Sequence, residues 1–300
     1  MKKFFNIFIV SLLLINIPIK VKSMETKDYI SEMKQDILTI MIAYPNYISR
    51  IEQIDDKVYL IMKSNKKIIY DDKKEKSHNE KLINPDIQDM LKQPYPLNKN
   101  TKIMDKDFDP GRARHYDLLN EVYGNSKNTI EKNLKPLKYG YTNYQFNSKN
   151  NANISLENTL RELIPLSKNR PDIGNILYPA SGTYNYRVIS GTGRLSPHSY
   201  GIAIDLRSNP NDYWKWSSKE KGEERLSKYP EELISAFEKN NFIWGGKWEH
   251  FDILHFEYRP EIILKAKYFS TWNQNKKWYE GAPLNEDTKK YIDIIENSLK

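Results

Sequence analysis

Two short segments of this sequence place histidine and aspartate side chains at spacings suited to binding a metal ion. In SPHSYGIAID, His198 stands seven residues before Asp205, and in WEHFDILHFEYRP, Asp252 stands three residues before His255. Two imidazoles and one carboxylate form a three-ligand set that leaves the fourth position of a zinc ion open for water. We therefore predict that His198, Asp205 and His255 bind Zn²⁺ and that Asp252 lies near that water as a general base.

The first segment predicts a β-strand over residues 200–207, YGIAIDLR, in which alternate side chains face opposite sides. The two isoleucines and the leucine of this segment then share a core face, and Gly201, Ala203 and Asp205 share the other. That second face has little bulk before the aspartate, so we expect a metal ion and its ligands to fill the space. An edge strand with Asp205 in water is the alternative, which periodicity leaves open.

The second segment predicts another strand, HFEYR, with His255, Glu257 and Arg259 on one face. Glu257 is then placed to accept a hydrogen bond from the His255 imidazole, and a salt bridge to Arg259 is the alternative. His250 falls on the opposite face, and His78 stands among charged residues. We expect neither to bind the metal directly.

The rest of the chain predicts a mixture of helices and short strands. Apolar residues recur at helical spacing in residues 27–44, 116–123, 158–168 and 230–240, and strand-like patterns occupy residues 57–72 (a hairpin), 184–194, 200–207, 242–248 and 254–260. Residues 71–81 are charged and predict a solvated loop. Since helices and strands do not alternate regularly, the fold class is α+β.

Several arginines and a histidine stand just before the predicted helix at 116–123. A solvated helix start is the interpretation we favour for Arg112 and Arg114, with bidentate recognition of a substrate carboxylate as the alternative. We expect His115 to lie on the helix surface.

The N-terminus and the composition indicate export. Lys2 and Lys3 precede an apolar run over residues 4–19, and Val21 and Ser23 supply small residues at the positions that a signal peptidase reads, which is typical of a signal peptide over residues 1–23. The alternative is an uncleaved segment that tethers the protein to the membrane.

The absence of cysteine from all 300 residues excludes thiolate zinc sites and cysteine nucleophiles. No basic block interleaved with aromatic residues indicates nucleic-acid binding.

The paired segments resemble the zinc D-alanyl-D-alanine carboxypeptidases and their L-alanyl-D-glutamate endopeptidase relatives, the VanY-type peptidoglycan peptidases. The family pattern Ser-x-His-x-x-Gly-x-Ala-x-Asp is matched by Ser196, His198, Gly201, Ala203 and Asp205. Its second element, an acidic residue followed three positions later by histidine, is matched by Asp252 and His255. The resemblance extends over residues 110–260. An aspartate here, where the dipeptidase branch has glutamate, leaves the substrate open.

The resemblance implies roles for further residues. The two histidines and Asp205 bind zinc in that family, the residue matched by Asp252 activates water, and an upstream arginine stabilises the carbonyl oxygen as it becomes an oxyanion. We predict Arg187 for this arginine, with Arg194 as the rival. Ser196 either contacts the substrate or caps the turn that follows it.

The implied fold is α+β and hedgehog/DD-peptidase-like, with a small antiparallel sheet, flanking helices and a zinc site. The predicted function is a secreted zinc metallopeptidase that hydrolyses amide bonds in peptidoglycan stem peptides, as a D-alanyl-D-alanine carboxypeptidase. The alternatives are an L-alanyl-D-glutamate endopeptidase and a non-catalytic zinc-stabilised cell-wall-binding domain. We divide the chain into a signal peptide (1–23), a helix-hairpin region (24–100), a catalytic domain (101–270) and a polar helical tail (271–300). The oligomeric state stays open.

Overall fold

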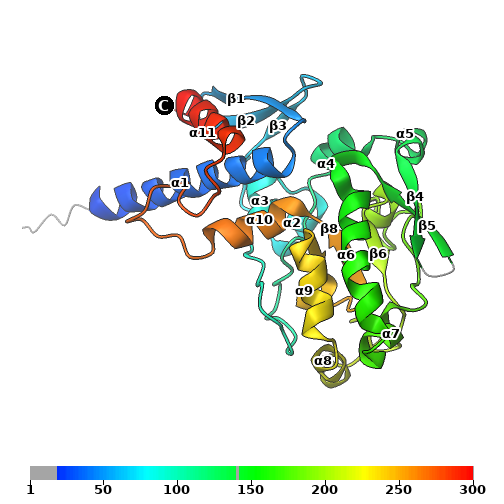
Figure 1. Cartoon of the computed structure of the whole chain (residues 1–300). Helices are drawn as coiled ribbons and strands as arrows, with labels where there is room; N and C mark the ends of the chain where they lie inside the picture. The colour runs from blue at the N-terminus through cyan, green and yellow to red at the C-terminus, as the bar shows by residue number, and fades with distance from the viewer. Residues whose placement is uncertain (1–18, 140–141, 300) are drawn as a thin grey trace, which may run out of the picture.

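The computed structural model describes residues 19–139 and 142–299. Most of the predicted signal peptide, residues 1–18, therefore lies outside the described residues. No helix within the described ranges is long and apolar enough to cross a membrane. The described chain combines helices with small antiparallel sheets, which confirms the α+β class (Figure 1).

The N-terminal part is a long helix followed by a three-stranded sheet and two short helices. These elements are α1 (Ile19–Ala43), β1 (Ile48–Ile54), β2 (Lys57–Met62), β3 (Lys67–Ile69), α2 (His78–Ile83) and α3 (Ile87–Leu91). The predicted helix and the β2–β3 hairpin are confirmed, and Asn65 adopts a φ of 69° in the turn. The strand β1, which pairs with β2, was not predicted.

The predicted solvated loop at 71–81 is wrong in part. Ser77 forms a capping box with Glu80 and begins α2 at His78. The Lys76 ammonium is buried against carboxylates, at 3.0 Å from Asp86 and 2.6 Å from Asp89. The run of charged residues indicated a solvent-exposed loop. The sequence alone did not show that the aspartates at the start of α3 would form an acidic pocket around Lys76.

The middle of the chain supplies helices and a β-hairpin that surround the first metal-binding segment. These are α4 (Tyr116–Tyr123), α5 (Lys127–Lys132), β4 (Leu134–Tyr139), β5 (Thr142–Asn147), η1 (Lys149–Asn151), α6 (Ala152–Ser167) and α7 (Pro171–Leu177). Helix α4 ends at Gly124, whose φ is 120°, as predicted. Helix α6 confirms the helix predicted at 158–168 and begins earlier.

The C-terminal half contains a second three-stranded antiparallel sheet in the order β6-β8-β7. Its elements are η2 (Pro197–Tyr200), β6 (Ala203–Asp205), α8 (Lys219–Ser227), α9 (Glu231–Lys239), β7 (Phe242–Trp244), η3 (Gly245–Lys247), β8 (His255–Tyr258), α10 (Pro260–Phe269) and α11 (Glu286–Ser298). The strand predicted at 184–194 is wrong, because the chain makes a tight turn there. Ile189 N–H donates to Arg194 O at 2.8 Å, and a single bridge joins Val188 to Leu195.

Aromatic packing fixes this sheet against α9. Leu233, Ile234 and Phe237 of α9 are buried, as the sequence predicts, and the Phe237 ring stacks on Phe256 of β8 with centroids 4.0 Å apart. Burial of such rings supplies most of the packing energy of a small core. Strand β8 is thus held from one side while its polar residues face the other.

The two ends of the chain pack together. Helix α1 contacts both α10 and α11, and α11 lies beside α1 and β1 (Figure 1). Tyr44 donates a buried hydrogen bond to Glu261 at 2.7 Å, and Lys34 pairs with Glu296 at 2.8 Å. The polar C-terminal residues therefore cover the N-terminal helix, and α11 buries Ile295 completely.

Candidate metal centre

The sheet brings the two metal-binding segments together. Strands β6 and β8 pair so that Asp205 lies opposite His255, and η2 delivers His198 from just before β6. Asp205 Oδ1 is 2.8 Å from His255 Nδ1 and 3.2 Å from His198 Nε2, and the two nitrogens are 3.3 Å apart. Ligands about 2.0–2.1 Å from a tetrahedral zinc ion lie roughly 3.3 Å from one another. The three atoms therefore fit around one ion.

The turn at 196–201 aims His198 at the site. Ser196 Oγ accepts a hydrogen bond from the His198 N–H at 3.3 Å, and Pro197 occupies the first helical position. Ser196 is only 2% exposed and fills the capping role. Gly201 closes the turn with a φ of 65°, a conformation that other residues rarely adopt.

The predicted strand over 200–207 is shorter than expected, with β6 spanning only Ala203–Asp205. The apolar face is confirmed, because Ile202, Ile204 and Leu206 are fully buried. The expectation that a metal fills the space above Gly201 is wrong. A Cβ on Gly201 would lie 2.6 Å from a Leu134 methyl group and 3.2 Å from the Asn147 nitrogen. Gly201 therefore lies against the β4–β5 hairpin, whereas Ala203 and Asp205 of β6 pair with Glu257 and His255 of β8.

Buried partners orient both imidazoles. His198 Nδ1 lies 2.5 Å from Thr183 O, which directs Nε2 toward Asp205. His255 Nε2 lies 3.7 Å from Glu257 Oε2 on the same face of β8, as the strand alternation predicts. His198 is thus held by a hydrogen bond and His255 faces a carboxylate, and each turns its other nitrogen toward Asp205.

Glu257 is itself held by arginine. Arg114 Nε and Nη2 reach the Glu257 carboxylate at 2.9 and 2.6 Å, and Arg259 Nη1 lies 3.4 Å from it. Glu257 and Arg259 are fully buried and Arg114 is 6% exposed. The solvated helix start that we expected at Arg114 is therefore wrong. No local sequence signal pointed to this ion pair, because its two residues are 143 positions apart.

The electrostatics of the cluster favour positive charge between the imidazoles. Burial would raise the pKa of Asp205, yet the charges and hydrogen bonds of His198 and His255 hold it well below its ordinary value. Burial would lower the pKa of His255, yet hydrogen bonds to Asp205 and Glu257 raise it to about 10. A divalent ion held by these three residues would be favoured by the same negative charge and would take the place of the imidazole proton.

Asp252 lies in a different environment. Burial, assisted by the negative charge of Asp205, raises its pKa to about 6. The backbone fixes its place, because Asp252 N–H donates to Gly245 O at 3.0 Å and His255 N–H donates to Asp252 O at 3.1 Å. A carboxyl group with a pKa near neutrality suits proton transfer at physiological pH.

The two candidate arginines occupy unlike surroundings. The Arg187 side chain is exposed, while its backbone N–H donates to Ser199 Oγ at 2.8 Å and its carbonyl accepts from Ser196 N–H at 3.0 Å. Arg194 is half-buried and donates through Nη1 to Leu82 O. Burial lowers the pKa of Arg194, and its Nε has no hydrogen-bond partner among the described residues. The Arg187 side chain is thus the more exposed of the two.

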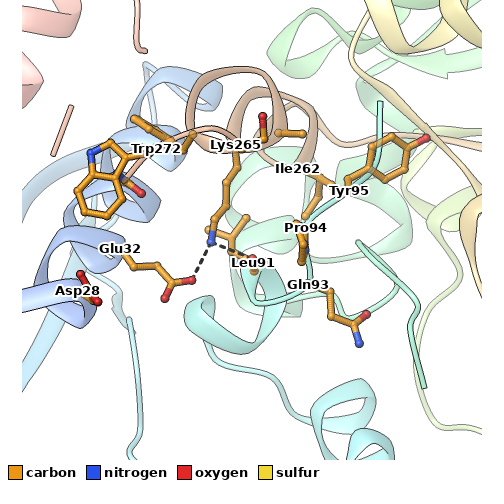
Figure 2. A pocket seen from close by; sticks show the side chains of 13 residues that line it. Asp28, Glu32, Leu91, Gln93, Pro94, Tyr95, Ile262, Lys265 and Trp272 are labelled. Atoms are coloured by element: carbon orange, nitrogen blue, oxygen red, sulfur yellow. Dashed lines mark hydrogen bonds and ion pairs between the residues drawn. The ribbon is translucent and has the colours of Figure 1, made fainter. Parts of the chain in front are cut away.

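A cavity of the described chain lies away from this cluster. It has a volume of about 270 Å³ and lies between α1, α3 and α10, with Leu91, Tyr95 and Trp272 among its walls (Figure 2). Lys265 spans it, 2.9 Å from Leu91 O and 3.4 Å from Glu32 (Figure 2). None of the predicted catalytic or metal-binding residues lines this cavity.

A comparison with models of protein families relates the segment that contains these residues to a known family. Residues 190–258 match a family model described as D-alanyl-D-alanine carboxypeptidase. This match confirms the resemblance to the VanY-type peptidases and supports a metallopeptidase acting on peptidoglycan. The matched residues include His198, Asp205, Asp252 and His255 and leave Arg187 just outside. No curated protein and no solved structure matches the chain.

Proposed function

We propose that this protein is an exported zinc peptidase that hydrolyses the terminal amide bond of peptidoglycan stem peptides, as a D-alanyl-D-alanine carboxypeptidase. The proposal rests on one observation: three ligand atoms lie within 3.3 Å of one another, namely His198 Nε2, His255 Nδ1 and Asp205 Oδ1. These atoms lie within the segment that matches the carboxypeptidase family model. The hedgehog/DD-peptidase-like architecture belongs to the same proposal.

His198, Asp205 and His255 are the residues that would hold Zn²⁺. The chemistry that the ion supplies when bound is a water whose pKa is lowered to about 7 and a polarised substrate carbonyl. Glu257, fixed by Arg114, keeps the His255 ring in the orientation that presents Nδ1 to the site. Ser196 acts through the backbone of His198 and is a positioning residue.

Asp252 carries the proton. Its carboxylate accepts the proton of the attacking water and returns it to the nitrogen of the leaving D-alanine, so that this group leaves as a neutral amine and not as an amide anion. Burial favours the protonated form, which is the state needed for the second transfer. Arg187 supports the carbonyl oxygen as negative charge develops on it, a contribution that is often worth several kcal/mol.

The test uses the chain from Met24 onward, incubated with peptidoglycan fragments and followed by mass spectrometry with and without a chelator. Loss of one D-alanine, blocked by the chelator, is the expected result. New D-glutamate N-termini would assign the endopeptidase instead. A zinc-loaded chain that cleaves neither bond would make the domain a binding module.

Variants assign the roles. Asp252→Asn should abolish cleavage while zinc content stays at the wild-type level, and Asp287→Asn, an exposed aspartate of α11, should change neither. Arg187→Ala and Arg194→Ala separate the two candidate arginines, because we expect only the first to lower kcat. Full activity in Asp252→Asn would rule out the proposed general base.

A further inference from the structure

A second group of two histidines and one aspartate lies outside the site described above. His78 begins α2, Asp109 precedes α4, and His250 follows η3, and their ligand atoms all lie within 4.8 Å of one another. Asp109 Oδ2 is 3.1 Å from His78 Nε2 and 2.8 Å from His250 Nδ1. The sequence predicts that neither histidine binds a metal, because His78 stands among charged residues and His250 falls on the face of its strand opposite His255.

The donor set reproduces that of the proposed catalytic centre. Each group has two imidazole nitrogens around one carboxylate oxygen, with oxygen-to-nitrogen distances of 2.8 and 3.2 Å at Asp205 and 2.8 and 3.1 Å at Asp109. Imidazole nitrogens with a single carboxylate suit zinc and its neighbours in the first transition row, whereas calcium and magnesium prefer oxygen ligands. The chemistry of the group therefore selects a borderline divalent ion.

Hydrogen bonding alone leaves Asp109 overcrowded. Three potential donors converge on its Oδ2: His78 Nε2 at 3.1 Å, His250 Nδ1 at 2.8 Å and Arg112 Nη1 at 3.0 Å. A carboxylate oxygen offers about two lone pairs, so three N–H groups cannot all donate well to it. An ion bound by the two neutral imidazoles would replace two of these donors with a single partner and leave the second lone pair to Arg112.

The surroundings are already built for an ion. The Asp109 side chain is 0% exposed, and its Oδ1 accepts the His250 backbone N–H at 3.0 Å, which fixes the carboxylate. The His78 and His250 rings are nearly parallel, at 6°, with centroids 6.0 Å apart. Their side chains are 20% and 22% exposed, so an ion can reach them from solvent. A cavity of about 60 Å³ adjoins His78 and Asp109.

We propose that His78, Asp109 and His250 form a second divalent metal site that binds Zn²⁺ and is independent of the proposed catalytic ion. Its ligands come from three segments that no strand pairing joins. Binding there would fasten α2 to the loop before α4 and to the segment that continues into Asp252. Metal binding of this kind stabilises the folded chain, because the unfolded chain does not hold the three ligands together. The inference does not rest on the proposed peptidase activity.

The test counts zinc by atomic emission in the purified chain and in variants that each remove one set of ligands. We expect two zinc ions per chain in the wild type, one in His78→Gln/His250→Gln, one in His198→Ala and two in His115→Asn. His115 is a control histidine outside both groups, and asparagine keeps its capping function. Circular dichroism establishes that each variant is folded.

Cobalt titration of the wild-type chain provides a measurement that needs no variant. Two saturable increments in the visible d–d absorption are expected, of which one persists in His198→Ala. A single zinc ion per chain that disappears in His198→Ala would overturn the second site and leave the proposed function intact. A single ion that disappears only in the His78→Gln/His250→Gln variant would support the second site and count against the catalytic centre.

Discussion

The buried ion pair between Arg114 and Glu257, beside His255, allows a quantitative prediction of folding stability. Arg114 binds Glu257 through two nitrogens, and Glu257 in turn contacts Arg259 and faces His255 Nε2. We consider Arg114→Met, Glu257→Gln and the double variant. Methionine matches the length of the arginine stem and carries no charge.

Each single change leaves a buried charge without its main partner. Arg114→Met removes the closest cation from Glu257, whose side chain is 0% exposed, and leaves only the longer contacts to Arg259 at 3.4 Å and His255 at 3.7 Å. Breaking one side of a buried pair typically destabilises a protein by about 3–5 kcal/mol, whereas replacing both charges together is often close to neutral. The double variant should therefore lose far less stability than the sum of the two single variants, with a coupling energy of at least about 2 kcal/mol. Arg259 keeps Glu261 at 2.5 Å throughout.

The assay is urea unfolding of the metal-free chains, which isolates the ion pair from the metal. A zinc competition titration on the same variants reports the effect on His255. Loss of a partner that orients a ligating histidine commonly weakens metal binding by roughly 10–100-fold. Glu257→Gln should therefore weaken zinc binding both alone and in the double variant, although the double variant regains folding stability. Single-variant losses that add up to the double-variant loss within about 0.5 kcal/mol would refute the coupling.

Three further predictions use other parts of the molecule. Gly201→Ala should lower the free energy of unfolding by about 2–4 kcal/mol, because it adds a clash with Leu134 at 2.6 Å to the strain of a positive φ. Gly191→Ala, at a φ of 76° with open space around it, should lower it by only about 1 kcal/mol. Equal losses in thermal unfolding would contradict the packing argument. Burial lowers the pKa of His115 to about 4, and its Nδ1 accepts the Leu118 N–H only when neutral. The folded-state pKa lies below the ordinary 6.5, so this contribution is complete above pH 6.5 and is lost as the pH falls toward 4, by about 3 kcal/mol at most. His115→Asn should flatten the stability profile in that window, and an unchanged slope would contradict the assignment. Chelation should lower the melting temperature, by an amount equivalent to about 4 kcal/mol where free zinc had been a thousandfold above Kd; an unaltered melting curve would count against both proposed sites.

Local patterns predicted those features whose cause is local. The helices over α1, α4 and α9 follow from apolar periodicity and end where Tyr44, Gly124 and Asn240 stop them. The face of β8 follows from alternation alone, which is why His255 and Glu257 were expected together and lie 3.7 Å apart. Short motifs sufficed because both halves of each motif lie within ten residues.

The sequence failed where a feature depends on distant parts of the chain. Arg114 was placed in solvent because Glu257 is 143 positions away, and Lys76 because its acidic pocket forms only when α2 and α3 fold back. The strand predicted at 184–194 has apolar residues at suitable intervals, but Gly191 at φ 76° turns the chain instead. Periodicity carries no information about a residue that is buried by a segment from elsewhere.

The segment from His250 to His255 unites the two groups of ligands, and its backbone is held on several sides. Ile253 N–H donates to Asp212 O at 2.7 Å, and Ile253 O accepts from Trp244 Nε1 at 2.7 Å. Phe251 O accepts from Trp214 N–H at 3.0 Å, so Asp252 stands between two anchored neighbours, with its own N–H bonded to Gly245 O. Proton transfer by a general base requires hydrogen-bond reach of the reacting water, and a fixed backbone meets that condition without a rearrangement. We infer that the fold fixes the backbone of Asp252, the proposed general base, independently of any substrate.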